Sequence, residues 1–295
     1  MHVLSPDQLL VVLRQRATEF PGLVQPRAAQ GHKGTYGTVV VVGGSEGMTG
    51  AAVLAGRSAL KSGCGKVFIG FAQNTLPLAM VGQAPELMLT TAAEALQKTS
   101  VGAWVVGCGL GLRQQAPLWL QKAMALTEDA PLLLDADALT LLALHPQPLP
   151  RGERVVLTPH PAEAGRLLQT SAADIQADRE GAAKALAAQY QAWIVLKGHR
   201  TLVASPQGAL WLNDSGNVGL ATAGSGDVLS GLIGGLLAQG LSMSEAVRAG
   251  VWLHGAAADY LVSQGVGPIG LTASELIDAA RWLRNDAVAA CQSRT

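Results

Sequence analysis

The sequence has little charge and no long apolar run, and each shortage excludes a class of protein. Only 14% of the 295 residues are charged, and 21 basic against 21 acidic side chains leave no net charge. A balanced charge gives no electrostatic basis for binding nucleic acid or an anionic membrane. The mean hydropathy is +0.27. Even so, Gly, Pro or charged residues interrupt each apolar stretch well before the roughly 20 residues that a membrane-spanning helix needs.

Cysteine is also scarce, and its spacing matches neither a disulfide framework nor a metal site. The chain has three cysteines, Cys64, Cys108 and Cys291, an odd number typical of a protein from the reducing cytoplasm. Nearly half of the residues (49%) are apolar, which argues against disorder. The sequence therefore predicts a cytoplasmic α/β protein. Its apolar, weakly charged composition also favours a homo-oligomer.

Short runs of Val, Ile and Leu alternate with longer segments of helical spacing from residue 38 onward. We expect strands at Thr38–Val42, Lys66–Phe71, Ala103–Val106, Leu132–Leu134, Arg154–Leu157 and Trp193–Leu196, and a hairpin over 201–212. Helices are expected over 5–16, 50–61, 115–126, 178–189, 227–239, 244–264 and 272–285. Continuously apolar strands separated by helices are typical of a parallel sheet covered on both faces. We expect residues 1–33 to form an N-terminal helix and connector, and residues 34–295 to form one domain.

Unusual residues follow five of these strands, where ligands of open α/β sheets bind. The segments are Gly43–Gly50, Gly107–Gly111, Asp135–Leu139, Thr158–Glu163 and Lys197–Thr201. Neither glycine cluster fits the dinucleotide fingerprint, and no Walker-type phosphate loop occurs. Each cluster taken alone fits a tight turn equally well. His160 could be a site residue or a turn residue that is hydrogen-bonded to the backbone. Lys197 and Thr201 could contact phosphate or nucleotide, although a solvent-exposed side chain is the simpler interpretation of Lys197.

The strongest single signal is Gly224-Ser225-Gly226-Asp227, which opens an apolar helix. The glycines let the backbone approach a ligand, and its N–H groups then point at one place at the positive end of the helix. Asp227, in the first turn, can act as a base toward a hydroxyl that attacks a phosphoryl group. An aspartate that only complements the helix dipole is the alternative. The Gly-x-Gly-Asp order favours the functional reading.

Together these segments resemble the ADP-dependent NAD(P)H-hydrate dehydratases of the ribokinase-like superfamily. Gly-x-Gly-Asp is shared with many small-molecule kinases, whereas Thr158–Pro161 combined with Gly107–Gly111 is much more specific to the dehydratases. The resemblance implies a three-layer α/β/α fold. It also implies a reaction in which ADP phosphorylates the C6 hydroxyl of hydrated NADH or NADPH, and phosphate then leaves to restore the nicotinamide. ADP is the co-substrate, and Mg²⁺ is expected beside the phosphates.

The resemblance also implies roles for particular residues. Asp227 is the base, and the segment Gly224, Ser225 and Gly226 forms the anion hole for the transferred phosphoryl group. The hydrated dinucleotide contacts Ala52, Gly109, His160 and Asp227. The nucleotide is held by Lys197, Gly198, His199, Arg200, Thr201 and Gly226. No metal ligand can be assigned. Ala162, Val218 and Met48 depart from the family pattern, which affects details of the pocket and leaves the phosphoryl centre unchanged.

Many members of this family carry an N-terminal epimerase domain. Only 33 residues precede Gly34, so we expect that domain to be absent, the S epimer to be the substrate, and a separate epimerase to convert the R epimer. Two other functions stay open. A ribokinase-like kinase of a vitamin-precursor alcohol would share Gly224–Asp227 and make a stable phosphate ester. A non-catalytic dinucleotide-binding protein would have no chemical use for Asp227.

Overall fold

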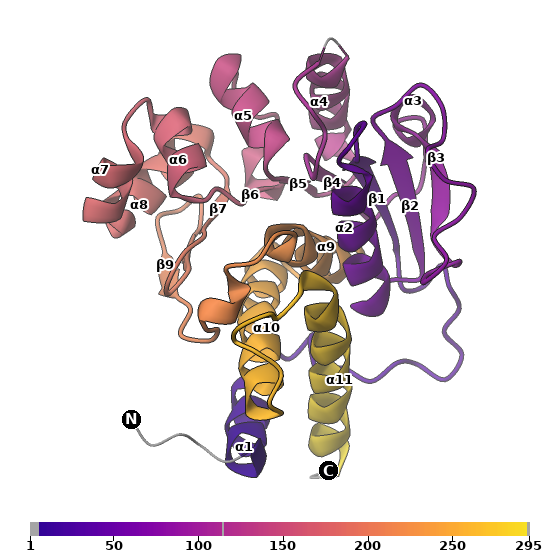
Figure 1. The fold of residues 1–295 in the computed structure, drawn as a ribbon, viewed down its shortest axis with the longest axis vertical. Coiled ribbons are helices and arrows are strands. Elements are labelled where there is room, and N and C mark those ends of the chain that lie inside the picture. The colour runs from indigo at the N-terminus through magenta and orange to yellow at the C-terminus, as the bar shows by residue number, and fades with distance from the viewer. Residues whose placement is uncertain (1–5, 114, 294–295) are drawn as a thin grey trace.

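The computed structural model describes residues 6–113 and 115–293, which form a mixed sheet of nine strands (Figure 1). The strands are β1 (Thr38–Gly43), β2 (Lys66–Phe71), β3 (Met88–Thr91), β4 (Ala103–Val106), β5 (Leu132–Leu134), β6 (Val155–Leu157), β7 (Trp193–Leu196), β8 (Leu202–Ala204) and β9 (Leu210–Leu212). Their order is β3-β2-β1-β4-β5-β6-β7-β8-β9. The strands β1 to β7 are parallel, and β8 and β9 extend the sheet as an antiparallel hairpin.

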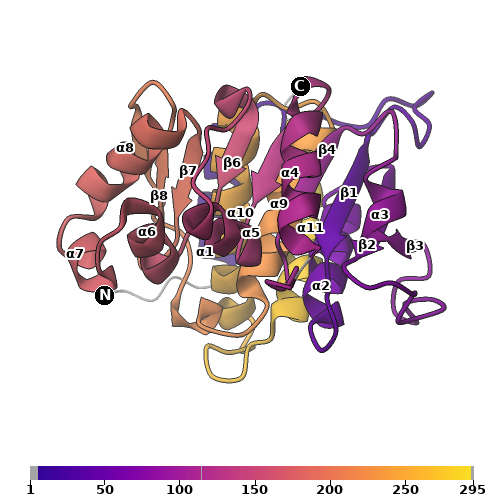
Figure 2. The same cartoon turned by 90° about the horizontal axis from the view of Figure 1, so that it is seen from above.

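Helices cover both faces of this sheet. One face carries α1 (Pro6–Ala17), α2 (Thr49–Lys61), α9 (Ser225–Ala238), α10 (Met243–Ser263) and α11 (Ala273–Gln292). The other carries α3 (Ala92–Ala95), α4 (Ala116–Ala125), α5 (Asp137–Leu144), α6 (Pro161–Leu168), α7 (Ala172–Ala177) and α8 (Arg179–Tyr190). Figures 1 and 2 show the two helix layers with the sheet between them. The predicted three-layer α/β/α architecture is confirmed.

The alternation of side chains along β1 explains why two separate cores form. Val39 and Val41 pack with α2 and α9 on one face, whereas Val40 and Val42 pack with the opposite helices. Every residue of β1 is buried, as expected for a parallel strand covered on both sides. The chain runs outward from β1 to β3 and then returns to β4 beside β1. This reversal of direction opens the crevice in which doubly wound sheets bind ligands.

Sequence patterns located six of the seven parallel strands and the hairpin to within one residue at each end. They missed the edge strand β3, because half of Met88–Thr91 is threonine and Thr90 alone in the strand is buried. They also missed α3, α5, α6 and α7, which are eight residues long or shorter. Ser5, the expected cap of the first helix, lies outside the described residues.

Among the described residues no helix combines the length and apolar character that crossing a bilayer requires.

Candidate active site

The two glycine clusters meet at the carboxyl ends of β1 and β4. The N–H of Gly44 donates to the carbonyl of Cys108 over 2.9 Å, and that of Ser45 donates to the carbonyl of Gly109 over 2.7 Å. A Cβ atom at Gly43 would lie 2.2 Å from the Cys108 oxygen, and one at Gly107 would lie 1.8 Å from the Asp135 oxygen. Glycine is therefore required because neighbouring backbones touch here. Both clusters are tight turns that together form the floor of the crevice.

A buried ion pair lies beside this floor. Asp135 follows β5 and is 1% exposed. Its Oδ1 accepts a 2.8 Å hydrogen bond from Lys197 Nζ, and its Oδ2 accepts one of the same length from Ser230 Oγ. Burial alone would raise the pKa of Asp135, but the Lys197 charge and the hydrogen bonds from Lys197, Thr158 and Ser230 together outweigh it, and the pKa is lowered. Burial likewise opposes the charge of Lys197, whose pKa is nevertheless raised by Asp135 and Glu163. Both partners are therefore ionised.

Asp227 lies next to this ion pair in the first turn of α9. Ligand atoms of Cys108, Asp135 and Asp227 lie within 4.8 Å of one another. Burial, followed by the charge of Asp135, raises the pKa of Asp227 to about 6. The Cys108 thiol is fully buried beside these carboxylates, and its pKa is raised well above the usual range. Cys108 is thus a protonated hydrogen-bonding neighbour of Asp227, a role that the sequence reading as a small buried side chain did not include.

The N-terminal turn of α9 brings the predicted anion hole to the same place. Gly224 has φ +86° and would clash through a Cβ with Leu54, so a left-handed glycine turn starts the helix. The first N–H groups of a helix have no partner within it, and they attract anions. A Cβ at Gly226 would lie 3.4 Å from Lys197 Nζ. The four predicted catalytic residues, 224–227, therefore adjoin the Asp135–Lys197 ion pair.

A cavity of about 550 Å³ opens beside this turn. Its lining includes all the residues predicted to hold the nucleotide, namely Lys197, Gly198, His199, Arg200, Thr201 and Gly226. Ser225 Oγ lies 3.3 Å from Nε2 of the buried His254, whose pKa burial lowers to about 4. His254 is therefore neutral near pH 7. Lys197 and Arg200 bring positive charge to this cavity, whereas His254 brings none near pH 7.

Sequence reasoning did not identify Asp259, the carboxylate that holds the loop around Gly216 in the wall of this cavity. Asp259, on α10, accepts hydrogen bonds from the N–H of Gly216 (2.8 Å) and from Asn217 Nδ2 (2.9 Å). Asn217 in turn accepts from the N–H of Gly219. Gly216 and Asn217 line the cavity. Asp259 lies within the long helix α10, and nothing in the sequence around it indicated a contact with this loop.

His160 combines the two interpretations that its sequence left open. Its Nδ1 accepts from the backbone N–H groups of Ala162 (3.1 Å) and Glu163 (3.3 Å), so the ring caps α6. The same ring lines the nucleotide cavity, and Nε2 lies 3.4 Å from a Glu163 carboxylate oxygen. Burial is the main cause that lowers the pKa of His160. Because Nδ1 accepts hydrogen bonds, the proton of the neutral ring is on Nε2.

A second cavity, of about 1,050 Å³, opens on the other side of the glycine floor. It is lined by Ser45, Met48, Gln73, Leu110, Gly111 and Trp119, among others. Asp137 fixes one wall by accepting from the N–H of Gly111 over 2.8 Å. Ala52 is fully buried below Gly44, and neither Ala52 nor Gly109 is part of the lining of either cavity. Their contact with the dinucleotide stays a prediction.

The carboxylates around Asp227 leave one clear ligand for a hard cation. Mg²⁺ prefers oxygen ligands and keeps several waters or phosphate oxygens. Asp135 is already bonded to Lys197 and Ser230, and the Cys108 thiol is protonated. Asp227 fits the group, because its carboxylate lies beside the anion-binding turn and makes no ion pair with a described residue. Nucleotide phosphates would have to supply further oxygens.

Comparison with known proteins shows the family to which the chain belongs. Residues 39–281 match the family model described as NAD(P)H-hydrate dehydratase. The ADP-dependent (S)-NAD(P)H-hydrate dehydratase of Neisseria meningitidis serogroup B is 52% identical over 274 residues, which cover 92% of this chain and 93% of the relative.

Solved structures agree. The ADP/ATP-dependent NAD(P)H-hydrate dehydratase of Bacillus subtilis, crystallised with ATP and Mg²⁺, superposes with a TM-score of 0.78 at 37% identity, over 89% of this chain and 94% of that one. A ribokinase-like superfamily protein of Enterococcus faecalis gives 0.78 at 26% identity, over 91% and 95%. The fold is therefore ribokinase-like, and the chain belongs to the NAD(P)H-hydrate dehydratase family.

Proposed function

We propose that this protein dehydrates the S epimer of hydrated NADH and NADPH and uses ADP as the phosphoryl donor. The observation that carries the proposal is the carboxylate of Asp227. It lies next to Cys108 of the glycine floor, and it directly follows Gly226, which lines the nucleotide cavity. A protein that only binds a dinucleotide has no use for a buried base with a pKa of about 6. A base of that pKa is well matched to proton transfer near neutral pH.

The reaction needs two chemical steps because hydroxide is a poor leaving group. The hydroxyl oxygen on C6 first attacks the β-phosphorus of ADP while Asp227 accepts the hydroxyl proton, and AMP leaves. The C6–O bond then breaks with help from the ring-nitrogen lone pair, and inorganic phosphate departs. Loss of the C5 proton restores the double bond of the reduced nicotinamide. The products are AMP, phosphate and NAD(P)H.

The chain's own residues supply the electrostatics of the first step. The backbone N–H groups at the start of α9, including that of Gly226, point to where charge develops on the transferred phosphoryl group. Residues 197–201 hold the nucleotide, while Ala52, Gly109 and His160 contact the hydrated dinucleotide. Magnesium, when bound, neutralises phosphate charge. Asp227 is the carboxylate placed to share in holding it.

Absorbance at the reduced-nicotinamide band tests the proposal directly. Purified protein, Mg²⁺, ADP and hydrated NADH should give a rise that depends on ADP and releases equal amounts of AMP and phosphate. We expect Asp227→Asn to lower kcat by at least about 100-fold, the smaller end of the range for general bases, while nucleotide still binds. Asp129→Asn, at an exposed carboxylate far from the cavity, is the matched control and should act as wild type.

The same assay separates the alternatives. A stable phosphate ester without restored absorbance would assign a kinase, and equal behaviour of wild type and Asp227→Asn would assign a binding protein. The ratio of kcat/KM for ADP to that for ATP measures the donor preference. We place the enzyme in the cytoplasm, where its substrate class is found, with a separate epimerase that supplies the S epimer. We expect a homo-oligomer, which light scattering would detect.

A further inference from the structure

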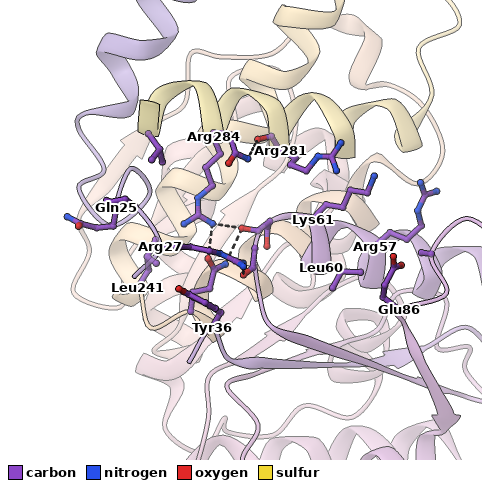
Figure 3. A pocket seen from close by; sticks show the side chains of 18 of the residues that line it. Gln25, Arg27, Tyr36, Arg57, Leu60, Lys61, Glu86, Leu241, Arg281 and Arg284 are labelled. Carbon is purple, nitrogen blue, oxygen red and sulfur yellow. Dashed lines mark hydrogen bonds between the residues drawn. The ribbon is translucent and has the colours of Figure 1, made fainter. Parts of the chain in front are cut away.

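A third cavity, of about 750 Å³, lies at the opposite edge of the sheet from the nucleotide site. Its walls are the connector before β1, the last turn of α2 and one side of α11 (Figure 3). Tyr36 lies just before β1 starts, and Gly63 lies just before β2 starts. The cavity is therefore at the amino ends of the strands, where the active-site residues described above are absent. It needs an explanation of its own.

Positive charge gathers in this cavity, although the whole chain is neutral. The cationic lining residues are Arg27, Arg57, Lys61, Arg281 and Arg284, and the acidic one is Glu86. Asp278 lies next to the cavity and is shared, with its Oδ1 2.5 Å from Lys61 Nζ and 3.2 Å from Arg281. One carboxylate thus serves two cations. Neither it nor Glu86 makes an ion pair with the remaining three arginines within the described ranges.

Among the residues that the structure describes, Arg27 and Arg284 bond only to uncharged acceptors. Arg27 donates to the carbonyl of Gly63, while Arg284 donates to the carbonyl of Leu23 (2.9 Å), to that of Ser62 and to Gln239 Oε1 (2.8 Å). The Ser62 and Gly63 carbonyls lie just past the C-terminal end of α2, and these neutral acceptors leave both arginines without a counter-ion. Burial, together with the charge of Arg27, lowers the pKa of Arg284 to about 10. Arg284 remains protonated near pH 7, at an electrostatic cost.

Arg57 adds a donor that is not used. Its Nε is buried and, among the described residues, has no hydrogen-bond partner, while another of its nitrogens donates to Gln83 over 3.2 Å. A buried N–H without an acceptor is unfavourable, particularly on a charged group. Arg57 precedes Lys61 by one helical turn, so both lie on the same side of α2. Figure 3 shows both side chains extending from α2 toward the side of the cavity on which Arg281 lies.

We propose that this cavity binds a phosphate-bearing small molecule, with phosphate oxygens accepting from Arg57, Lys61 and Arg281. Arginine offers a planar fork of donors that matches phosphate oxygens in pairs. The volume is within the range of ordinary ligand sites. The five cationic side chains exceed the two carboxylates, Asp278 and Glu86, by three charges, and an anion with two or more charges would offset most of this excess. The proposal does not depend on the reaction at Asp227.

Titration calorimetry with pyrophosphate tests this site. We compare wild type, the double variant Arg57→Gln/Arg281→Gln, and a matched control, Lys122→Gln/Lys184→Gln, which removes two exposed charges elsewhere. Affinity should fall at least about tenfold in the arginine variant, corresponding to about 1.4 kcal/mol. It should stay unchanged in the control and in Thr201→Ala, which alters the nucleotide cavity. Far-UV circular dichroism and thermal melting confirm that each variant folds.

Wild-type affinity in the arginine variant would place any pyrophosphate binding in the active site and overturn the proposal. Absence of binding to wild type at millimolar pyrophosphate and low salt would overturn it too. A second titration with AMP identifies the source of the phosphate. If the arginine variant loses more affinity for AMP than for pyrophosphate, the ligand is a nucleotide. If it loses more for pyrophosphate, the ligand is a free polyphosphate. Either result supports the site.

Discussion

Lys197 Nζ lies 2.8 Å from Oδ1 of Asp135 and thus joins the ends of two strands separated in the sheet by β6 alone. The side chain of Asp135 is 2% exposed and that of Lys197 is 21% exposed. A second carboxylate oxygen, from Glu163, lies 3.9 Å from the same ammonium. Lys197 therefore holds buried negative charge as well as lining the nucleotide cavity. Removing it would leave Asp135 and Asp227 side by side with no described cation between them.

Lys197→Met should destabilise the protein by about 3 kcal/mol, because breaking a buried pair leaves an uncompensated charge. The double variant Asp135→Asn/Lys197→Met should recover most of this loss, since neither charge then remains. Urea denaturation of the wild type, both single variants and the double variant measures the coupling. Strictly additive losses would show that the two residues do not depend on each other.

The dependence of kcat/KM on pH should show an acidic limb near pH 6. Burial and the charge of Asp135 raise the pKa of Asp227 to about 6, and the base must be deprotonated to act. Activity therefore rises with pH through this value and levels off above it. Asp135→Asn removes the neighbouring negative charge, so the limb should move to lower pH. The limb should not move in Asp129→Asn. An unchanged limb in Asp135→Asn would contradict this electrostatic account.

Asp259→Asn should raise the KM for ADP about tenfold with little change in kcat. An asparagine amide cannot accept from both Gly216 N–H and Asn217 Nδ2 as the carboxylate does. Loss of a charge-assisted hydrogen bond costs about 1.5–3 kcal/mol. Steady-state kinetics at varied ADP separates KM from kcat. Asp214→Asn, an exposed carboxylate on the same loop, should leave KM unchanged. A loss of kcat with unchanged KM would show that Asp259 acts in the chemical step and does not merely position the loop.

Gly231→Ala should destabilise the protein by about 1–3 kcal/mol, the usual range for overpacking a core. A Cβ at Gly231 would lie 2.0 Å from the carbonyl oxygen of Ala55, at the contact of α9 with α2. Gly50→Ala is the matched control, because a Cβ there has no neighbour within 4 Å. Alanine should be neutral or slightly stabilising at that helical position. Equal melting temperatures of the two variants would contradict the close contact.

The layered fold was predictable because it depends on local signals. Runs such as Trp193–Leu196 and Leu132–Leu134 are continuously apolar, and strands buried on both faces must be so. The carboxyl ends of parallel strands lie on one edge, so the approximate location of the site followed as well. The sequence shows that Gly107 is a glycine after a strand, but it does not show why glycine is needed there, which is the close contact with the backbone of Asp135.

The pairings within the site could not be predicted from one sequence. Asp135 and Lys197 are 62 residues apart, and both follow apolar strands like several other polar residues. Asp259 occurs within the repeat of a long helix, where a carboxylate usually faces solvent. Cys108 looked like a small core residue, and it is one, but its contact with Asp227 depends on how β4 and α9 pack. Such long-range contacts are set by tertiary packing, which local patterns do not record.

The helices α2 and α9 each begin at the active-site edge and end at the basic cavity. With 14 residues in α9, the two ends are about 20 Å apart. The helices touch backbone to backbone at Gly231 and Ala55, so they form a stiff unit with one end in each site. Thermodynamic linkage then requires any effect of an anion on ADP affinity to be matched by an equal effect of ADP on anion affinity. The length of this helix pair would thus set the distance over which binding at one site is coupled to binding at the other.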